Sequence, residues 1–285
     1  MSGSTYVPST LRLQREVAKR RAARRSTFIA GLSTLVAALV IYVLVTNAPG
    51  WDRVQTSFFS WEYLTKSLPK IIDGLWLNLR IMIVAEICIL VIGLSVALAR
   101  TTRSPLLFPL RIVAAAYTDI FRGLPLLLVI LLLGLGVPAL RIDGLTNSVV
   151  VWGAAALVLT YSAYVAEVLR AGIESVHPTQ RMAARALGMT PTQTTRHVVL
   201  PQAVRRVIPP LLNDLVSLQK DSGLISVLGA IDAIKAAQIV TATSFNFTPY
   251  VTAGLVFVAL TIPMARFTDW VTARMARRQS QGGVA

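Results

Sequence analysis

The sequence predicts an all-α protein that crosses a membrane several times. Hydrophobic residues make up 54% of the 285 positions, and mean hydropathy is +0.63. Charged residues make up only 14%, whereas soluble domains carry roughly a quarter. A helix that spans a bilayer needs about 20 apolar residues, and six runs have about that length: 27–46, 75–99, 112–135, 148–169, 204–228 and 249–272.

The apolar runs differ in how far charged residues and prolines interrupt them. The first has no charged residue between Thr27 and Thr46 and no small-residue cleavage site after it, so it is expected to be a retained helix rather than a signal peptide. The fifth run is interrupted by prolines and charges, namely Pro209, Pro210, Asp214, Lys220 and Asp221.

The positive charges alternate along the chain. The formal net charge is +15, and the arginine-rich stretches lie before the first run, after the second and fourth runs, and after the last. Six spans that begin inside place all of these stretches in the cytoplasm, together with both termini. This placement argues against nucleic acid and makes anionic membrane lipids the partner of the positive charge.

The charge pattern divides the chain into five parts. They are a basic cytoplasmic tail (1–26), an accessory transmembrane helix (27–46), an external connection with an aromatic belt (47–73), a main membrane domain (74–272) and a second basic cytoplasmic tail (273–285).

Two kinds of chemistry are not expected in this chain. Cys88 is the only cysteine, and His177 and His197 have no metal-ligand company, so we expect no disulfide and no metal site. The sequence has no Gly-x-x-x-x-Gly-Lys-Ser/Thr motif, which cradles nucleotide phosphates. We therefore expect no catalytic residues, no bound cofactor and no ATPase activity.

The connection between the fourth and fifth runs predicts a pair of short helices. The turn at His177-Pro178 puts Thr179 at the N-cap of a helix that reaches Leu187, with Gly188 as its C′ residue. Thr190-Pro191 opens a second helix that is expected to end at Pro201. The pair, about 178–201, forms a narrow cytoplasmic knob that could seat in a groove; the alternative is a solvated amphipathic loop.

Charged side chains inside a membrane are expensive and mark pairing or function. Asp119 with Arg122, Glu167 with Arg170, and Arg266 with Asp269 are spaced i,i+3, so each pair can neutralise itself on one helix. We interpret Glu167, Arg170, Lys220 and Asp221 as structural charge pairs.

Other polar groups are candidates for a substrate pathway. Glu86 has no local partner, so a core hydrogen bond and a substrate contact are both open. The Gly123-Leu124-Pro125 break frees backbone groups inside a membrane helix, which is tolerated where they line a cavity. The candidate set is Glu86, Asp119, Arg122, Gly123, Leu124, Thr160, Tyr161 and Ser162, with core packing as the alternative for the last three.

The ordered set of motifs resembles the permease subunits of bacterial ABC importers for polar amino acids. The matching segments cover about residues 64–272 and are Gly74 to Arg80, Asp119 to Leu128, Tyr161 to Arg170, Ala183 to Gly188, Leu200-Pro201, Asn213 to Ser222, and Leu224 to Gly229. The resemblance implies a type I importer fold, here a five-helix core plus one extra N-terminal transmembrane helix, in the bacterial cytoplasmic (inner) membrane.

The resemblance also implies partners and roles. ABC ATPase subunits, which bind ATP and Mg, would dock on the short helices through Met182, Ala183, Ala184, Gly188, Leu200 and Pro201. A second permease subunit, identical or homologous, and an extracytoplasmic substrate-binding protein would complete an alternating-access importer of amino acids. Two positions depart from the family pattern: Met182 stands where a Glu is usual, and Leu124 where a Thr is frequent.

Three other functions remain open on the sequence alone. An ion-coupled secondary transporter could work through Glu86, Asp119 or Asp214 without an ATPase. An ABC permease for a different small solute would share most of the motifs. A membrane scaffold without transport would leave the Gly-Leu-Pro break and the short helices unexplained.

Overall fold

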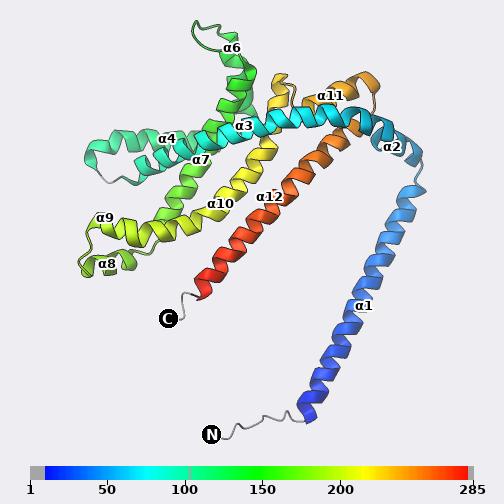
Figure 1. The fold of residues 1–285 in the computed structure, drawn as a ribbon, viewed down its shortest axis with the longest axis horizontal. Helices are drawn as coiled ribbons and strands as arrows, with labels where there is room; N and C mark the ends of the chain where they lie inside the picture. Colours follow the sequence, from blue (N-terminus) through cyan, green and yellow to red (C-terminus); the bar gives the residue numbers. More distant parts are fainter. Residues whose placement is uncertain (1–9, 103, 282–285) are drawn as a thin grey trace. The chain divides into compact units, whose positions relative to one another are not determined.

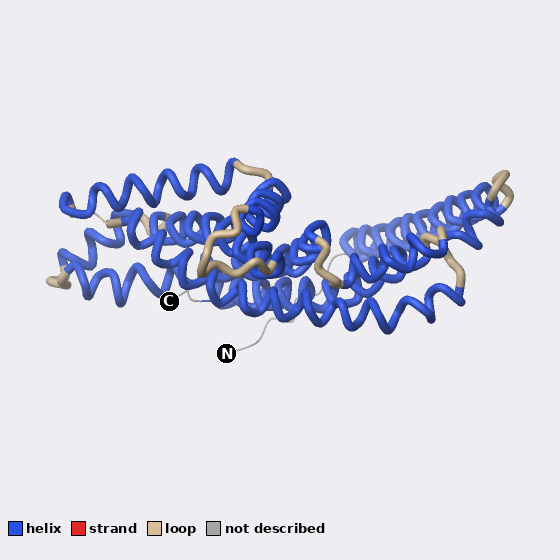
Figure 2. The backbone as a smooth tube through the Cα atoms, turned by 90° about the horizontal axis from the view of Figure 1, so that it is seen from above, coloured by secondary structure: helices blue, strands red, loops and turns tan. Residues whose placement is uncertain are grey.

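The computed structural model describes residues 10–102 and 104–281. Over these ranges the chain forms helices and loops and no strand, as Figure 2 shows. The chain divides into two units, residues 1–56 and 57–285, each of which is described by itself.

The first unit is dominated by one long helix, α1 (Thr10–Thr46), and includes most of α2 (Trp51–Phe58). Between Ala23 and Thr46, the most apolar 18-residue window of α1 has a mean hydropathy of 2.6 and no buried residue, which suits a helix surrounded by lipid. The described part of the predicted basic tail (1–26) is helical and continues directly into the apolar stretch. No proline or glycine breaks the helix between them, and the arginines and alanines there are strong helix formers. Residues 1–9 of the predicted basic tail lie outside the described residues.

The second unit contains the bundle shown in Figure 1. Its elements in order are α3 (Trp61–Thr101), η1 (Pro105–Leu107), α4 (Phe108–Gly123), α5 (Leu126–Leu131), η2 (Leu132–Gly136), α6 (Val137–Ala139), α7 (Val149–Glu174), α8 (Pro178–Ala186), α9 (Pro191–Thr194), η3 (Thr195–Val199), α10 (Leu200–Asp221), η4 (Ser222–Leu228), α11 (Ala233–Ser244) and α12 (Thr248–Gln281).

The predicted spans are only partly continuous helices. Four helical stretches of the described chain are long and apolar enough to cross a membrane, and the number rises to six if each of two bent pairs counts as one span. The predicted run 112–135 is not one straight helix, because the chain bends by 104° between Gly123 and Leu126. Pro125 lacks an N–H and disfavours helical geometry in the residue before it, so the helix must end there.

Two predicted boundaries fall inside helices. The connection 47–73 is largely helical, since α2 lies within it and α3 begins at Trp61 and runs through Pro69. The predicted C-terminal tail begins inside α12, which continues to Gln281. In both places the chain stays helical although its polarity changes, because polarity alone does not end a helix.

The core of the second unit lies where α7 packs against its neighbours. On α3 the buried positions follow a helical stripe that includes Ile81, Ala85 and Ile89. On α7 half of the most apolar window is buried, and Ala156, Leu157, Tyr161 and Val165 join the α3 stripe in one cluster. Small residues let helices approach closely: a Cβ on Gly93 of α3 would lie 2.6 Å from the Val165 side chain.

A second cluster fixes α11 to α3. The Asn78 amide donates to Asp232 Oδ2 at 3.1 Å and accepts from the Ala233 backbone N–H at 3.2 Å. Asp232 also caps α11, because its Oδ1 accepts from the Lys235 backbone N–H at 2.8 Å. Gly74, one turn before Asn78, lets the backbone at Asp232 and Ala233 approach α3. We call Gly74, Asn78 and Asp232 the α3–α11 latch.

Candidate functional site: coupling helices and polar interior

The connection between α7 and α10 forms the predicted pair of short helices, α8 and α9. His177, not Thr179, is the N-cap of α8, and its side chain accepts from the Thr179 backbone N–H at 3.3 Å. This differs from the prediction because Pro178 occupies the first helical position, so the residue before it must be the cap. At the other end, Gly188 has φ +83° as the predicted C′ residue.

The hydrogen bonds after α8 make Gly188 a structural requirement. Its N–H donates to Arg185 O at 2.9 Å, and the Met189 N–H donates to Ala184 O at 3.2 Å. These two bonds are the Schellman pattern, which needs a left-handed residue at C′. The turn between α8 and α9 therefore depends on the left-handed backbone of Gly188.

The second short helix begins as predicted but does not end as predicted. Thr190 forms a capping box with Gln193, and Pro191 follows at the first helical position. The helix was expected to end at Pro201, yet the chain passes through the π-helical turn η3 into α10 without a break. The wider i→i+5 turn accommodates a proline that could not take part in the ordinary ladder. The second short helix is thus the start of α10.

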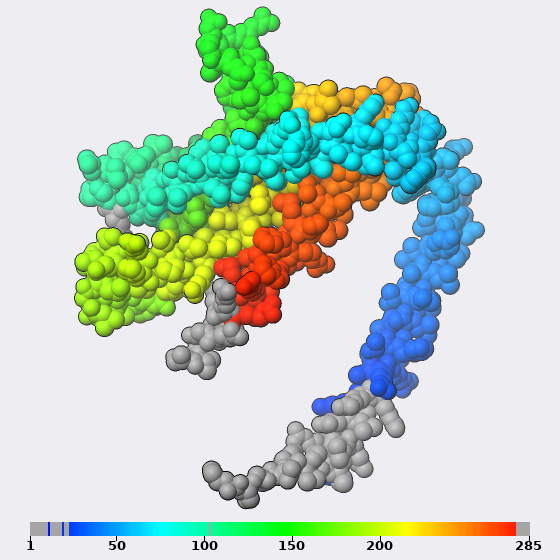
Figure 3. Space-filling view, in the orientation of Figure 1, coloured from blue at the N-terminus to red at the C-terminus, as the bar shows by residue number. Residues whose placement is uncertain are grey.

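A hydrogen bond attaches α8 to the end of α7: the Arg181 guanidinium donates to Ile173 O at 2.6 Å. Nearby, the Arg206 guanidinium of α10 donates to Ser175 Oγ at 2.7 Å and so joins α10 to the end of α7. Of the six predicted coupling residues, only Ala184 is buried; Met182, Ala183, Gly188, Leu200 and Pro201 are exposed. The pair therefore exposes several apolar residues among polar ones, and α8 is attached to α7, at one end of the bundle (Figure 3).

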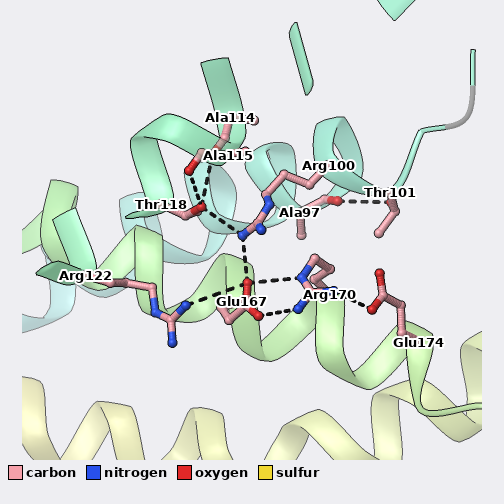
Figure 4. Close-up of polar contacts among 10 residues, drawn as sticks. All are labelled: Ala97, Arg100, Thr101, Ala114, Ala115, Thr118, Arg122, Glu167, Arg170 and Glu174. Carbon is pink, nitrogen blue, oxygen red and sulfur yellow. Dashed lines mark hydrogen bonds and ion pairs between the residues drawn. The ribbon is translucent and has the colours of Figure 1, made fainter. Parts of the chain in front are cut away.

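Beside this pair, three arginines converge on one carboxylate, as Figure 4 shows. The Arg100 guanidinium of α3 donates to Glu167 Oε2 at 2.7 Å and to Thr118 Oγ1 at 2.8 Å. Arg170 donates to the same carboxylate, with its Nε 3.1 Å from Oε2, and Arg122 Nη1 lies 3.9 Å away. We call this group the Glu167 cluster; it connects α3, α4 and α7.

The Glu167 cluster corrects part of the predicted pairing. Glu167 and Arg170 do pair, but Arg122 faces Glu167, and no ion pair joins it to Asp119, which is exposed. Lys220 and Asp221 do not pair either within the described part of the chain. Asp221 Oδ2 instead accepts from the Tyr161 hydroxyl at 2.7 Å, and Lys220 is exposed. The spacing rule considers one helix only, whereas these partners come from different helices.

The remaining pathway candidates form a polar group in the interior. Tyr161 is flanked in the sequence by Thr160 and Ser162, which are 1% and 0% exposed, and the Thr160 hydroxyl has no hydrogen-bond partner. Asp214 of α10 acts electrostatically on both Glu86 and Tyr161, and its Oδ2 is buried without a partner. We call Glu86, Tyr161, Asp214 and Asp221 the acidic group.

Two other candidates lie elsewhere. Gly123 is the exposed last residue of α4, and a Cβ added there would have no heavy atom within 4 Å. Leu124 packs against the core. Sequence reasoning named Asp214 for the ion-coupled alternative but left it out of the candidate substrate pathway. The available signal was a charged residue within an otherwise apolar run. Arg100 was missed because it sits at a helix end in a basic stretch.

Comparison with known proteins agrees with this architecture. Residues 89–277 match the family described as binding-protein-dependent transport system inner membrane component. A relative from Rickettsia conorii, named as a candidate glutamine transport system permease protein (GlnP), is 40% identical over 189 residues, which cover 65% of this chain and 84% of the relative. The arginine transport system permease protein ArtQ of Bacillus subtilis (strain 168) is 34% identical over 200 residues, covering 68% and 87%.

A solved structure described as an amino acid ABC transporter with histidines aligns with a TM-score of 0.69 at 31% identity, over 75% of this chain and 98% of that chain. The family match covers well over half of the chain. It includes α8 and α9, which we call the coupling pair, the Glu167 cluster and, except for Glu86, the acidic group. This chain therefore belongs to the inner membrane components of binding-protein-dependent transport systems, as the permease subunit of an ABC transporter.

Proposed function

We propose that this chain forms the translocation pathway of a polar amino acid importer, driven by separate ATPase subunits that dock on α8 and α9. The observation that carries the proposal is the build of this pair. Two large apolar side chains of the pair are exposed, Met182 (61% exposed) and Leu187 (85% exposed), while a hydrogen bond from Arg181 attaches α8 to the end of α7. An exposed apolar surface on a rigid support is typical of a docking site for another protein.

The chain offers a direct route from this pair to the interior. Because α9 and η3 continue into α10, a displacement of the pair moves α10, which carries Asp214 and Asp221 of the acidic group. A second route passes through Arg181, whose hydrogen bond ties α8 to the end of α7. The ATPase subunits, with their ATP and Mg, would thus shift the bundle between discrete packings.

The acidic group suits one end of an amino acid. Glu86 and Asp214 bring carboxylates together without a cation among the described residues that pair with either. An ammonium group would neutralise them in a medium where isolated charges are expensive. Relatives named for glutamine and arginine transport, and a related structure determined with histidines, support amino acids as the substrate class.

The proposal includes further partners. A second permease, identical or homologous, would complete the pathway, and an extracytoplasmic binding protein would deliver substrate. The positive-inside pattern supports cytoplasmic termini and a cytoplasmic position for α8 and α9.

Copurification and uptake test the proposal together. The variant Ala183→Arg places a long charged side chain on the exposed face of α8, so the ATPase subunits should no longer copurify and uptake should stop. A matched control is Ala273→Arg on α12, also exposed, which should keep both. If Ala183→Arg retains its ATPase and transports normally, the docking site lies elsewhere.

The ion-coupled alternative gives a different result in the same experiment. Uptake into vesicles that hold the permease without any ATPase, driven by an ion gradient alone, would reject the proposal. Uptake that requires internal ATP and the ATPase subunits would support it.

A further inference from the structure

A cavity of about 520 Å³ lies between the end of α3 and the coupling pair. Its walls come from the last turns of α3 and α7 and from α8, α9 and η3, so it separates the coupling pair from the rest of the bundle. None of the residues that line it belongs to the acidic group or to the Glu167 cluster, although Met182 and Leu200 are also predicted coupling residues. The cavity therefore needs an explanation of its own.

Two buried donors at this cavity have no partner. Thr194 is 4% exposed, and its hydroxyl makes no hydrogen bond. Thr101 and Thr195 also line the cavity, but their hydroxyls donate to the backbone carbonyl four residues earlier, at 3.0 and 2.9 Å. Arg181 donates to Ile173 O through Nη2, whereas its Nε is buried without an acceptor. Buried polar groups left unsatisfied mark a place where a ligand or an ion belongs.

The charge of the walls selects the kind of ligand. Arg181 and Arg185 both line the cavity, and no carboxylate does. The neighbouring carboxylate, Glu174, lies at a separate cavity that also involves Arg181 and is already paired with Arg170. Two guanidinium groups and one unpartnered hydroxyl form a site for an oxyanion, since guanidinium groups bind phosphate oxygens with good geometry.

The remaining walls are aliphatic. Leu98, Ile173 and Val199 line the cavity, and Leu98 is 54% exposed on α3 close to the end of a span. An anion that also carries hydrocarbon fits this combination better than a free ion does. Anionic phospholipids have that chemistry, and basic pockets between helices at the cytoplasmic side of a membrane bind their headgroups.

We propose that this cavity binds the phosphate of an anionic phospholipid and thereby ties the coupling pair to the end of α3. The proposal rests on the proposed function for one point, the position of α8 and α9 at the cytoplasmic surface. A lipid whose phosphate is held by Arg181, Arg185 and Thr194 of the pair, and whose hydrocarbon lies against Leu98 of α3 and Ile173 of α7, contacts both sides of the gap that must change when the pair moves. The lipid composition of the membrane would then affect how far a displacement of the coupling pair by the ATPase subunits moves the rest of the bundle.

Native mass spectrometry of the purified transporter complex tests the proposal. Phosphatidylglycerol should bind at lower concentration than phosphatidylcholine, which carries no net charge. Loss of one arginine contact is worth about a five-fold change in binding, so Arg185→Gln should weaken phosphatidylglycerol binding by about that factor. Thr194→Val, which keeps the shape of the side chain, should weaken it by a similar amount because the hydroxyl donor is lost.

The matched control is Arg196→Gln. Arg196 is exposed on η3, a few residues from Thr194, and does not line the cavity. Its loss should leave phosphatidylglycerol binding unchanged. If Arg196→Gln weakens binding as much as Arg185→Gln, the lipid is held by diffuse attraction to basic residues and the site is wrong.

Two further outcomes would overturn the proposal. Displacement of phosphatidylglycerol by millimolar inorganic phosphate would show that the cavity takes a small free anion. Equal binding of the two lipids, or none, would show that no phosphate is recognised.

The measurement needs neither ATP nor substrate, so it is separate from the test of transport. Failure of the proposed function would appear as transport without an ATPase, whereas failure of this inference would appear as lipid binding indifferent to Arg185 and Thr194.

Discussion

Gly74→Ala should destabilise the bundle by closing the space that the α3–α11 latch needs. A Cβ at this position would lie 2.5 Å from Ala233 N and 2.5 Å from Asp232 O. Both are backbone atoms at the start of α11, so neither can rotate away. The substitution must push α3 and α11 apart and stretch the two hydrogen bonds made by Asn78, at 3.1 and 3.2 Å.

The magnitude follows from three contributions. Overpacking in a close-packed interior costs about 1–3 kcal/mol, and weakening the buried Asn78–Asp232 hydrogen bond costs about 1–2 kcal/mol. Alanine gains roughly 0.5–1 kcal/mol over glycine inside a helix. The net expectation is a loss of roughly 2–3 kcal/mol, which in a domain of this size lowers the unfolding midpoint by about 5–10 °C.

Gel filtration of the heated, detergent-solubilised protein measures that midpoint. Gly254→Ala in α12 is the matched control, because it makes the same change in a helix where no atom lies within 4 Å of the new Cβ. The control should match the parent protein or exceed it slightly. Equal midpoints for Gly74→Ala and Gly254→Ala would refute the close approach of α3 and α11.

Three further substitutions test the polar contacts and the pathway. Glu167→Gln leaves Arg100 and Arg170 without their common carboxylate, and since their side chains are 16% and 26% exposed, we expect a loss of about 2 kcal/mol in the same thermal assay, below the 3–5 kcal/mol of a fully buried pair. Tyr161→Phe removes the 2.7 Å hydrogen bond to Asp221 and should cost about 1–2 kcal/mol, with an altered apparent affinity for substrate in an uptake assay as the sign that the acidic group contacts it. Gly123→Leu meets open space, so the protein should assemble at parental yield while uptake is abolished; normal uptake would remove Gly123 from the pathway.

The local signals in the sequence predicted much of the fold. Apolar runs located the long helices, and the Gly-Leu-Pro sequence located the sharp break after α4, because each depends on residues close together in the chain. Gly188 and Thr190 were correctly placed at helix ends for the same reason: a left-handed glycine and a capping threonine act within one turn. The prediction that the second short helix ends at Pro201 was wrong. Proline has no N–H to donate to the helical ladder, but the π-helical turn η3 before it lets the chain continue into α10.

Contacts between distant residues were beyond that reasoning. Asn78 and Asp232 are 154 positions apart, and Arg100 and Glu167 are 67 apart. Periodicity shows which face of a helix is apolar but does not show which other helix will cover it. The i,i+3 rule accordingly assigned Arg122 to Asp119, whereas packing of α4 against α7 turned it toward Glu167.

The two long-range clusters, the α3–α11 latch and the Glu167 cluster, hold α3 at two separate positions. On α3, Asn78 anchors the latch and Arg100 anchors the Glu167 cluster, so α3 is tied to α11 at one point and to α7 at the other. Glu86 lies between them, about 12 Å from Asn78 and about 21 Å from Arg100 along the helix axis at 1.5 Å per residue. Near Glu86 the α10 carboxylate Asp214 has a buried oxygen without a hydrogen bond. Polar contacts thus hold α3 at two positions away from the acidic group, whereas within that group one hydrogen bond joins Tyr161 of α7 to Asp221 of α10 and an oxygen of Asp214 stays unsatisfied. In such a bundle a movement of α10, driven from the coupling pair, changes the surroundings of the acidic group first, while α3 and α7 keep their mutual positions.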